Sequence, residues 1–582
     1  MEANSDSHET TGIQHIPLYL IHKLDYSKSQ IRLLSILPGQ KDEVVNCRCY
    51  IVDLDDRPVF NALSYVWGDA RNKANLMLEG ARIKITNSLA AALSRIPLPH
   101  EAVAIWADAV CINQRDPAEK AHQIGLMQKI YSQCSNSLVW MGDISVKGDT
   151  GEAAVKAARA ALNALRISAD EPHDALIGWP GQDPVAVSAG GECITAGAAL
   201  QALMDCAWWQ RIWTVQEIVL PPEATILWGR LHISFATIMK AAENMMDPAK
   251  RPEPNDVFDL FRAGTAMYPP EYLGPFSVPV MSVLQAKHWD EWDVDPLTRL
   301  WRFRDRKATN SKDKLFGMWA LIKEGSLAST KPSDYSLDVA ILFRKVTVDL
   351  LRSLNSLKPL IGWRGERVTD GLPSWVLDLV QRDPLECVSD FWTHEIAWDK
   401  FDSSRGLPQF RLHRDSDNSD LFLELDGIRV DQVARIVADS RYNESSEWRE
   451  ILERVIGEGM SREELLGQFD NLIQGRLDER HPRVFDPGWG NSWWVDRMLR
   501  AQVLFLTCDN RIGVGPPSLK PEDDIWILSG GNHPFLLRSN TSEEGGLRRW
   551  ELIGDCFVYG IMYGEVTDAS KSVIQTQLAI IY

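Results

Sequence analysis

Residues 103–143 read VAIWADAVCINQRDPAEKAHQIGLMQKIYSQCSNSLVWMGD. The apolar run at the start and the run SLVW near the end each have the length of a buried strand, and polar residues follow both. The residues between them predict a helix over 117–133. Asp116 can cap its N-terminus, Pro117 occupies the first helical position, and Glu119 completes a D-x-x-E capping box. A strand, a helix and a strand in this order predict a parallel β–α–β unit.

The flanking segments extend this unit into a larger domain. The predicted strands cover residues 16–52, 60–70 and 224–229, and the predicted helices cover residues 152–167 and about 198–220. The residues before them, 1–15, are polar and predict a disordered tail. We therefore expect an α/β domain over residues 16–230, built on a parallel sheet.

The remaining sequence changes character twice. Residues 231–482 predict a mainly helical and mixed middle region, and residues 483–582 predict a β-rich module. This last region consists of short apolar runs, such as VLFLT at 503–507, separated by Gly, Pro and Asp turns, which is typical of a small antiparallel barrel. Gly513-Val-Gly515 begins like a dinucleotide-binding loop, but two prolines follow it, and we interpret it as a turn.

Composition narrows the class of protein. The chain has 582 residues, which predicts several domains, and 62 basic against 80 acidic residues give a net charge of −18. Such an acidic surface disfavours binding to nucleic acid or to anionic membranes. No apolar run is long enough to span a membrane, and the N-terminal residues lack the pattern of a secretory signal. The nine cysteines are scattered without a C-x-x-C pair, so we expect a cytoplasmic protein without a disulfide framework. The sequence has no P-loop and no metal-spaced Cys/His cluster, and we expect neither a bound metal nor a cofactor.

Three blocks in the predicted α/β domain carry more specific information. They read ALSYVWGD at 62–69, WADAVCINQRD at 106–116 and WWQRIWTVQE at 208–217. In order, spacing and identity they resemble the HET domain of filamentous fungi. Later motifs, among them RKATNSKDKLFG at 306–317 and PSDY at 332–335, resemble the usual body of such proteins. The resemblance implies a heterokaryon incompatibility protein, an effector of non-self recognition and regulated cell death when genetically different hyphae fuse.

The HET pattern in turn resembles a divergent Toll/interleukin-receptor (TIR) domain, a flavodoxin-like α/β fold with NAD-cleaving members. Leu63-Ser64-Tyr65 corresponds to the I-S-Y of the first strand in that family, and Asp108 falls near the end of the second strand. Trp213-Thr-Val-Gln-Glu217 is similar to the family's W-C-x-x-E, whose glutamate is catalytic. Here Thr214 stands in place of the cysteine, and the stretch between the third strand and the glutamate is longer than in TIR domains.

The resemblance implies that Glu217 is the catalytic residue and that NAD is the substrate. Nicotinamide leaves NAD as a neutral ring, so the site needs no general acid, and one carboxylate can stabilise the oxocarbenium-like ribose. Ligands of open α/β sheets bind at the C-terminal ends of the strands. The candidate substrate-binding residues at these ends and beside the glutamate are Ser64, Tyr65, Trp67, Gly68, Asp108 and Trp213. Trp67 or Trp213 could stack on a base, and Ser64 could bind ribose or phosphate.

Other interpretations stay open. On a helix, Ile212, Val215 and Val219 would form the core stripe, and Trp213 and Glu217 would share the opposite face, covered by a ligand or by another domain. Asp108 equally suits the cap of a loop or helix. The rival function is a non-catalytic domain that acts through self-association and recruits an unknown partner in incompatibility signalling. A pocket beside Glu217 would favour the enzyme, and a filled or fully exposed face would favour the rival.

Overall fold

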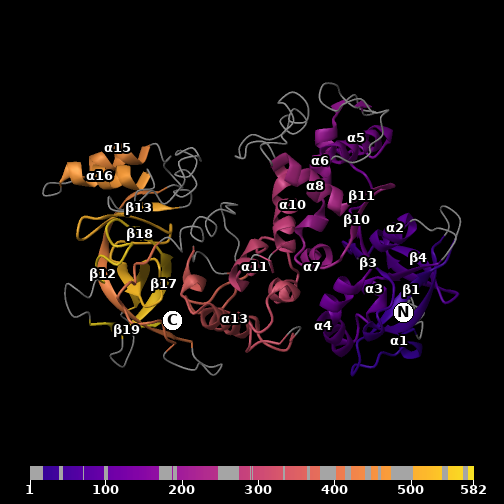
Figure 1. The fold of residues 1–582 in the computed structure, drawn as a ribbon, viewed down its shortest axis with the longest axis horizontal. Coiled ribbons are helices and arrows are strands. Elements are labelled where there is room, and N and C mark those ends of the chain that lie inside the picture. The colour runs from indigo at the N-terminus through magenta and orange to yellow at the C-terminus, as the bar shows by residue number, and fades with distance from the viewer. Residues whose placement is uncertain are drawn as a thin grey trace, which may run out of the picture. The chain divides into compact units, whose positions relative to one another are not determined.

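The computed structural model describes residues 18–38, 44–69, 71–96, 102–169, 186–187, 193–246, 274–288, 290–291, 293–331, 334–362, 368–380, 401–412, 421–439, 447–456, 461–473, 502–540, 548–567 and 575–582 (Figure 1). The chain forms two compact units. The first runs to Val294 and also includes Asp305–Ile322 and Pro332–Tyr335, and the second comprises the remainder. The predicted domain end at 230 therefore falls inside the first unit. The predicted tail at 1–15 lies outside the described residues.

The first unit is organised around a parallel core, as the sequence predicts. Strand β3 (Asn61–Tyr65) pairs in parallel with both β6 (Val103–Trp106) and β7 (Asn136–Trp140), and β10 (Ala224–Trp228) pairs in parallel with β7. In the described part of the chain these strands belong to a nine-stranded mixed sheet of order β11-β10-β7-β3-β6-β1-β2-β4-β5. The other members are β1 (Gln30–Ile36), β2 (Asn46–Asp53), β4 (Lys73–Leu78), β5 (Ala81–Thr86) and β11 (Leu231–Ser234).

The predicted connecting helix is present as α4 (Pro117–Gln133). The Asp116 carboxylate accepts from the backbone N–H groups of Ala118 and Glu119 and so caps the helix. Its apolar side packs on the sheet, where the ring of Tyr131 meets Trp106 edge-on with centroids 5.8 Å apart. The β–α–β prediction from residues 103–143 is confirmed.

Helices fill the rest of the first unit. They are α2 (Asn87–Arg95), α3 (Asp108–Cys111), α5 (Glu152–Ser168), α6 (Ala196–Met204), α7 (Thr214–Val219), α8 (Phe235–Met246), α10 (Gly274–Lys287) and α12 (Asp313–Phe316), with short 3-10 turns η1 (Leu54–Asp56), η2 (Ala207–Gln210) and η3 (Trp319–Leu321). Helices α5, α6, α8 and α10 pack on one another, and α8 also contacts β10 and β11 (Figure 1). A small hairpin joins β8 (Ala186–Val187) to β9 (Cys193–Ile194).

Two local predictions in this unit are wrong. The segment Leu18–Ile21, predicted as a strand, is the short helix α1, and its Tyr19 hydroxyl donates to the backbone of the β6–α4 connection. The helix predicted over about 198–220 is broken into α6, η2 and α7. It breaks at 210–212 because the backbone there hydrogen-bonds with Lys307 instead of continuing the helix.

The second unit contains helices and a barrel-like sheet. Its helices are α11 (Pro296–Arg302), α13 (Val339–Leu354), η4 (Lys358–Leu360), α15 (Trp448–Val455) and α16 (Arg462–Ile473), in agreement with a helical middle region. Its strands are β12 (Leu423–Asp439), β13 (Val503–Thr507), β14 (Ile512–Gly515), β15 (Asp524–Leu528), β16 (Phe535–Asn540), β17 (Arg549–Asp555), β18 (Phe557–Val558) and β19 (Gln577–Ile581).

The long strand β12 closes the barrel. It pairs with β19 at its start, with β15 in its middle and with β13 toward its end, and the chain of pairings β15-β16-β17-β19-β12 returns to β15. Register shifts along β12 let one strand serve these different partners. Figure 1 shows the strands curled together, and helices α15 and α16, which pack on each other, contact β12 and β14 respectively. Residues 423–439 thus belong to the barrel, although the sequence groups them with the middle region.

The predicted turn at Gly513-Val-Gly515 is also wrong, because these residues lie in strand β14. A Cβ atom on Gly513 would lie 2.2 Å from the ring of Phe505. The glycine is therefore needed for the close approach of an aromatic ring and not for a bend.

No helix in the described ranges is both long and apolar enough to pass through a membrane.

Candidate functional site

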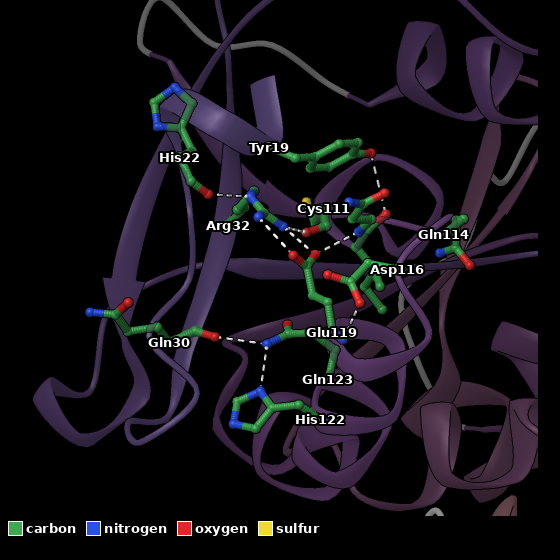
Figure 2. A network of polar contacts seen from close by, with 12 residues as sticks. Tyr19, His22, Gln30, Arg32, Cys111, Gln114, Asp116, Glu119, His122 and Gln123 are labelled. Carbon is green, nitrogen blue, oxygen red and sulfur yellow. Dashed lines mark hydrogen bonds and ion pairs between the residues drawn. The ribbon is translucent and has the colours of Figure 1, made fainter. Parts of the chain in front are cut away.

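A buried ion pair anchors the second sequence block. Arg32 on β1 is fully buried, and its guanidinium binds Glu119 with Nη1–Oε1 and Nη2–Oε2 distances of 2.5 and 3.0 Å (Figure 2). The same guanidinium donates to the carbonyl oxygens of His22 and Cys111, and Glu119 Oε1 accepts from the backbone N–H of Asn113 at 2.6 Å. The predicted role of Glu119 in a capping box is wrong, because its carboxylate serves Arg32 and Asn113.

Tyr19 extends this network from helix α1. The centre of the Arg32 guanidinium lies 4.8 Å from the Tyr19 ring centroid, and the Tyr19 hydroxyl donates to the carbonyl oxygens of Val110 and Ile112. The connection from β6 to α4, which carries Asp108, is therefore fixed on both sides. The sequence gives no signal for the ion pair of this network, because Arg32 and Glu119 lie 87 positions apart.

Ser64 and Glu217, taken from the first and third blocks, are brought together at the sheet. The Ser64 hydroxyl at the end of β3 donates to Glu217 Oε2 at 2.5 Å, and it accepts from the indole nitrogen of Trp208 at 2.7 Å. On β7, Ser137 Oγ donates to the Glu217 carbonyl oxygen at 2.8 Å. Trp208 and Ser137 were not predicted as site residues, although Trp208 begins the third block.

The third block does not form the continuous helix from which a separate Trp213 and Glu217 face is predicted. Helix α7 begins only at Thr214, with Trp213 at its N-cap, and residues 214–218 are all buried. Glu217 is 7% exposed, because α7 lies among β3, β7, α4 and α10. The helical wheel assumes a continuous helix with a core stripe and an opposite face covered by a ligand or another domain, whereas α7 has only six residues and the sheet and other helices surround it. Trp213 is partly buried against the same core.

Asp108, Tyr65 and Trp67 form a second group beside the first. The indole nitrogen of Trp67 donates to Asp108 Oδ2 at 2.8 Å, and the backbone N–H of Ala109 donates to Asp108 Oδ1 at 2.7 Å. Burial, together with the negative charge of Asp108, raises the pKa of the nearby Tyr65 hydroxyl. Asp108 is the first residue of α3, so it does not cap that helix as the alternative suggested.

Gly68 follows this group at a sharp bend of the chain. Its φ of +71° lies in the left-handed region, and a Cβ atom there would meet Ser88 at 3.4 Å. Glycine therefore suits the turn that leads away from Trp67.

Arg211 connects the two groups, and it was not predicted as a site residue. Its guanidinium donates to the carbonyl oxygen of Tyr65 at 2.7 Å. Burial raises the pKa of Glu217 to about 7, while the positive charge of Arg211 and the Ser64 hydrogen bond oppose the rise. Burial also raises the pKa of Asp108, opposed by the Trp67 hydrogen bond and by Arg211.

The cluster therefore holds two carboxyl groups with raised pKa values around one guanidinium, at the ends of parallel strands. Such groups often mark a functional site. Within the described ranges, no group of His, Cys, Asp or Glu side chains has the arrangement of a metal site.

These features define a class: an α/β domain with two carboxyl groups of raised pKa at the ends of its parallel strands, followed by a β-barrel. Residues 60–217 match the family model described as Heterokaryon incompatibility protein (HET), and residues 491–573 match the one described as Het-6 beta-barrel domain. The chain is 21% identical to Heterokaryon incompatibility protein 6, OR allele, of Neurospora crassa over 688 aligned positions, which cover 98% of this chain and 99% of that protein. In these two regions the chain is therefore similar to heterokaryon incompatibility (HET) proteins. No solved structure matches it.

Proposed function

We propose that this protein is an effector of non-self recognition and regulated cell death. The matches to the two family models support this role, as does the similarity to a named incompatibility protein along nearly the whole chain. Both recognised regions lie on one chain, so the α/β domain and the barrel act as parts of one effector.

The chemistry that the cluster supports best is cleavage of the bond between nicotinamide and ribose in NAD, with a TIR-like use of Glu217. The observation that carries this proposal is the convergence of the first and third blocks, which places Ser64 against a buried Glu217 whose pKa is raised to about 7. Such a carboxyl group is ionised in a large fraction of molecules near neutral pH. In a site of low dielectric, its charge stabilises an oxocarbenium-like ribose strongly.

The surrounding residues have complementary roles in this proposal. The carboxylate of Asp108 adds negative potential that attracts the cationic nicotinamide ring, and Trp67 and Tyr65 beside it offer aromatic surface. Trp213 at the N-cap of α7 offers a second ring. Gly68 leaves room for the chain to turn away from the ligand. NAD is a substrate here and not a resident cofactor.

One observation favours a second function. Glu217 is only 7% exposed, its carboxylate accepts a hydrogen bond from Ser64, and Ser64 accepts one from Trp208. A filled environment of this kind suits a structural carboxyl group. The domain would then act without catalysis, through self-association and recruitment of a protein partner in incompatibility signalling.

The two functions are separated by incubating the purified full-length protein with NAD and quantifying nicotinamide and ADP-ribose. The catalytic function predicts that both products accumulate, that the Glu217→Gln variant does not form them, and that expression of this variant no longer kills the cell. Killing by wild type without NAD loss in the cell or in vitro rejects the catalytic function. It supports the second, which a shift to larger oligomers on activation would then test.

A further inference from the structure

A segment far downstream of the HET match lies against the third block. We call residues 306–317, RKATNSKDKLFG, the strap. The strap forms an isolated parallel bridge between Lys307 and Arg211. The backbone N–H of Ile212 donates to the carbonyl oxygen of Lys307 at 3.0 Å, and the backbone N–H of Lys307 donates to the carbonyl oxygen of Gln210. These bonds hold the chain extended between η2 and α7.

A second contact reaches the start of α7. The guanidinium of Arg306, which is 7% exposed, donates to Thr214 Oγ1 at 3.0 Å. The Thr214 hydroxyl in turn lies 2.7 Å from the carbonyl oxygen of Arg211. Burial lowers the pKa of Arg306 to about 9, so the guanidinium is charged at neutral pH. Thr214 is the position at which the TIR pattern has cysteine, and a thiol is a much weaker acceptor than a hydroxyl. The strap therefore gives a reason for threonine at this position.

The far end of the strap closes on the same block. Asp313 accepts from the Tyr335 hydroxyl at 2.6 Å. Burial raises the pKa of Asp313, and the hydrogen bonds from Tyr335 and Trp213 and the charge of Arg211 oppose this rise. A Cβ atom on Gly317 would lie 2.9 Å from the Asp313 carbonyl oxygen and 3.1 Å from the Ile212 side chain. Only glycine allows this close approach.

We propose that the strap is a positioning element of the candidate site, so that the functional unit includes residues 306–317 although the family match ends at 217. It contacts Gln210, Arg211, Ile212, Trp213 and Thr214, the residues that lead directly into Glu217. A release of the strap frees the backbone of 210–214 and moves Arg211 away from Glu217. That the strap holds the third block in place does not depend on which reaction the site performs. The effect of the strap on killing, in contrast, rests on the proposed function.

The test uses the full-length chain and a matched pair of variants at one position. Lys307→Pro removes the backbone N–H that donates to Gln210, whereas Lys307→Ala keeps it and removes only an exposed side-chain contact. Hydrogen exchange is measured for amides in 210–219. We expect exchange to accelerate by at least about tenfold in Lys307→Pro and to remain unchanged in Lys307→Ala, since exchange reports local opening. A second pair covers the case in which Lys307→Pro does not fold: Thr214→Val removes the acceptor of Arg306, and Thr214→Ser keeps it.

A further readout distinguishes positioning from general structural support. The infrared band of the protonated Glu217 carboxyl group is isolated by subtracting the spectrum of the Glu217→Gln variant, and its titration midpoint is compared between strap variants of unchanged melting temperature. Because the charge of Arg211 lowers the pKa of Glu217, loss of the strap should move the midpoint upward in Lys307→Pro and Thr214→Val but not in their controls. Unchanged exchange and an unchanged midpoint in the folded variants would overturn the proposal. These two measurements need no activity, so a failure to detect NAD cleavage or killing rejects the proposed function alone.

Discussion

Replacement of Glu217 by glutamine tests the candidate site through stability as well as function. Burial raises the pKa of this carboxyl group from 4.5 to about 7 in the folded protein. The folded state therefore holds the proton more tightly than the unfolded state between these two values, and the stability contributed by the neutral carboxyl group is lost as pH rises through this interval. The difference of about 2.5 in pKa corresponds to at most about 3.4 kcal/mol over the full titration.

Glutamine stays neutral at every pH and keeps an oxygen that can accept from Ser64. We therefore expect the free energy of unfolding of wild type, measured relative to the Glu217→Gln variant, to fall by up to about 3 kcal/mol between pH 4.5 and pH 8. The chain has two compact units, so bulk unfolding is a poor measure. Native-state hydrogen exchange at β3 in low urea reports the opening of the first unit alone. A difference that does not vary with pH would refute the buried, perturbed carboxyl group.

The same variant tests catalysis. Loss of a preorganised charge beside the developing ribosyl cation should lower NAD turnover by about 10²–10³-fold. In wild type, the ionised fraction of Glu217 rises about tenfold between one pH unit below and one above its pKa, so turnover should rise from pH 6 to pH 8. A folded Glu217→Gln variant that consumes NAD and kills as well as wild type would eliminate Glu217 as the catalyst.

Three further substitutions test other parts of the structure. Arg32→Met should lower the free energy of unfolding of the first unit by about 3–5 kcal/mol, because it leaves the Glu119 charge buried without a partner. The double variant Arg32→Met with Glu119→Gln should recover part of this loss in the same denaturation experiment. Gly513→Ala should cost about 1–3 kcal/mol by overpacking the barrel, seen as a lower melting temperature of the second unit; an unchanged melting temperature would contradict the close ring contact. Trp67→Phe removes the donor to Asp108 and raises the pKa of Asp108 further. The variant should therefore lose about 1–3 kcal/mol of unfolding free energy at pH 8 and clearly less at pH 4. Equal losses at both pH values would show that the hydrogen bond does not depend on the charge of Asp108.

The parallel core of the first unit could be predicted because its signals are local. Asp116 and Pro117 lie within two residues of the helix start, and capping depends on neighbouring backbone groups. The apolar runs on either side fix the strands by length and pattern. The order of strand, helix and strand then restricts the topology to a parallel pair.

Long-range partners explain most of what the sequence does not reveal. Glu119 has the spacing of a capping box, yet a fully buried Arg32 requires a counter-charge, and the ion pair takes precedence over the local cap. In the same way, Leu18–Ile21 is apolar enough for a strand, but Tyr19 packs on this guanidinium from a helix. Neither partner can be found from spacing along the chain.

In the candidate site, motif resemblance gives the residues but not their surroundings. It pairs Ser64 with Glu217, and the structure places the two 2.5 Å apart. The helical wheel then gives the wrong environment, because it treats the segment as a continuous helix with a core stripe and an opposite face, whereas η2 ends at Gln210 and α7 begins at Thr214. Burial and not sequence position sets the raised pKa of Glu217, and burial depends on how the whole unit packs.

The first unit includes residues 305–322, and this extension affects the design of experiments on an isolated domain. The three blocks end at Glu217 and the last parallel strand ends at Trp228, so the sequence places the boundary near 230. A fragment that stops there lacks Lys307, whose backbone bonds to residues 210 and 212, and it lacks Arg306, which reaches Thr214. Because a buried Thr214 hydroxyl and an extended backbone at 210–212 need these partners, such a fragment would lose the geometry around Glu217 even if its sheet folded. Inactivity of the fragment would then report the absence of the strap and not the absence of chemistry at Glu217.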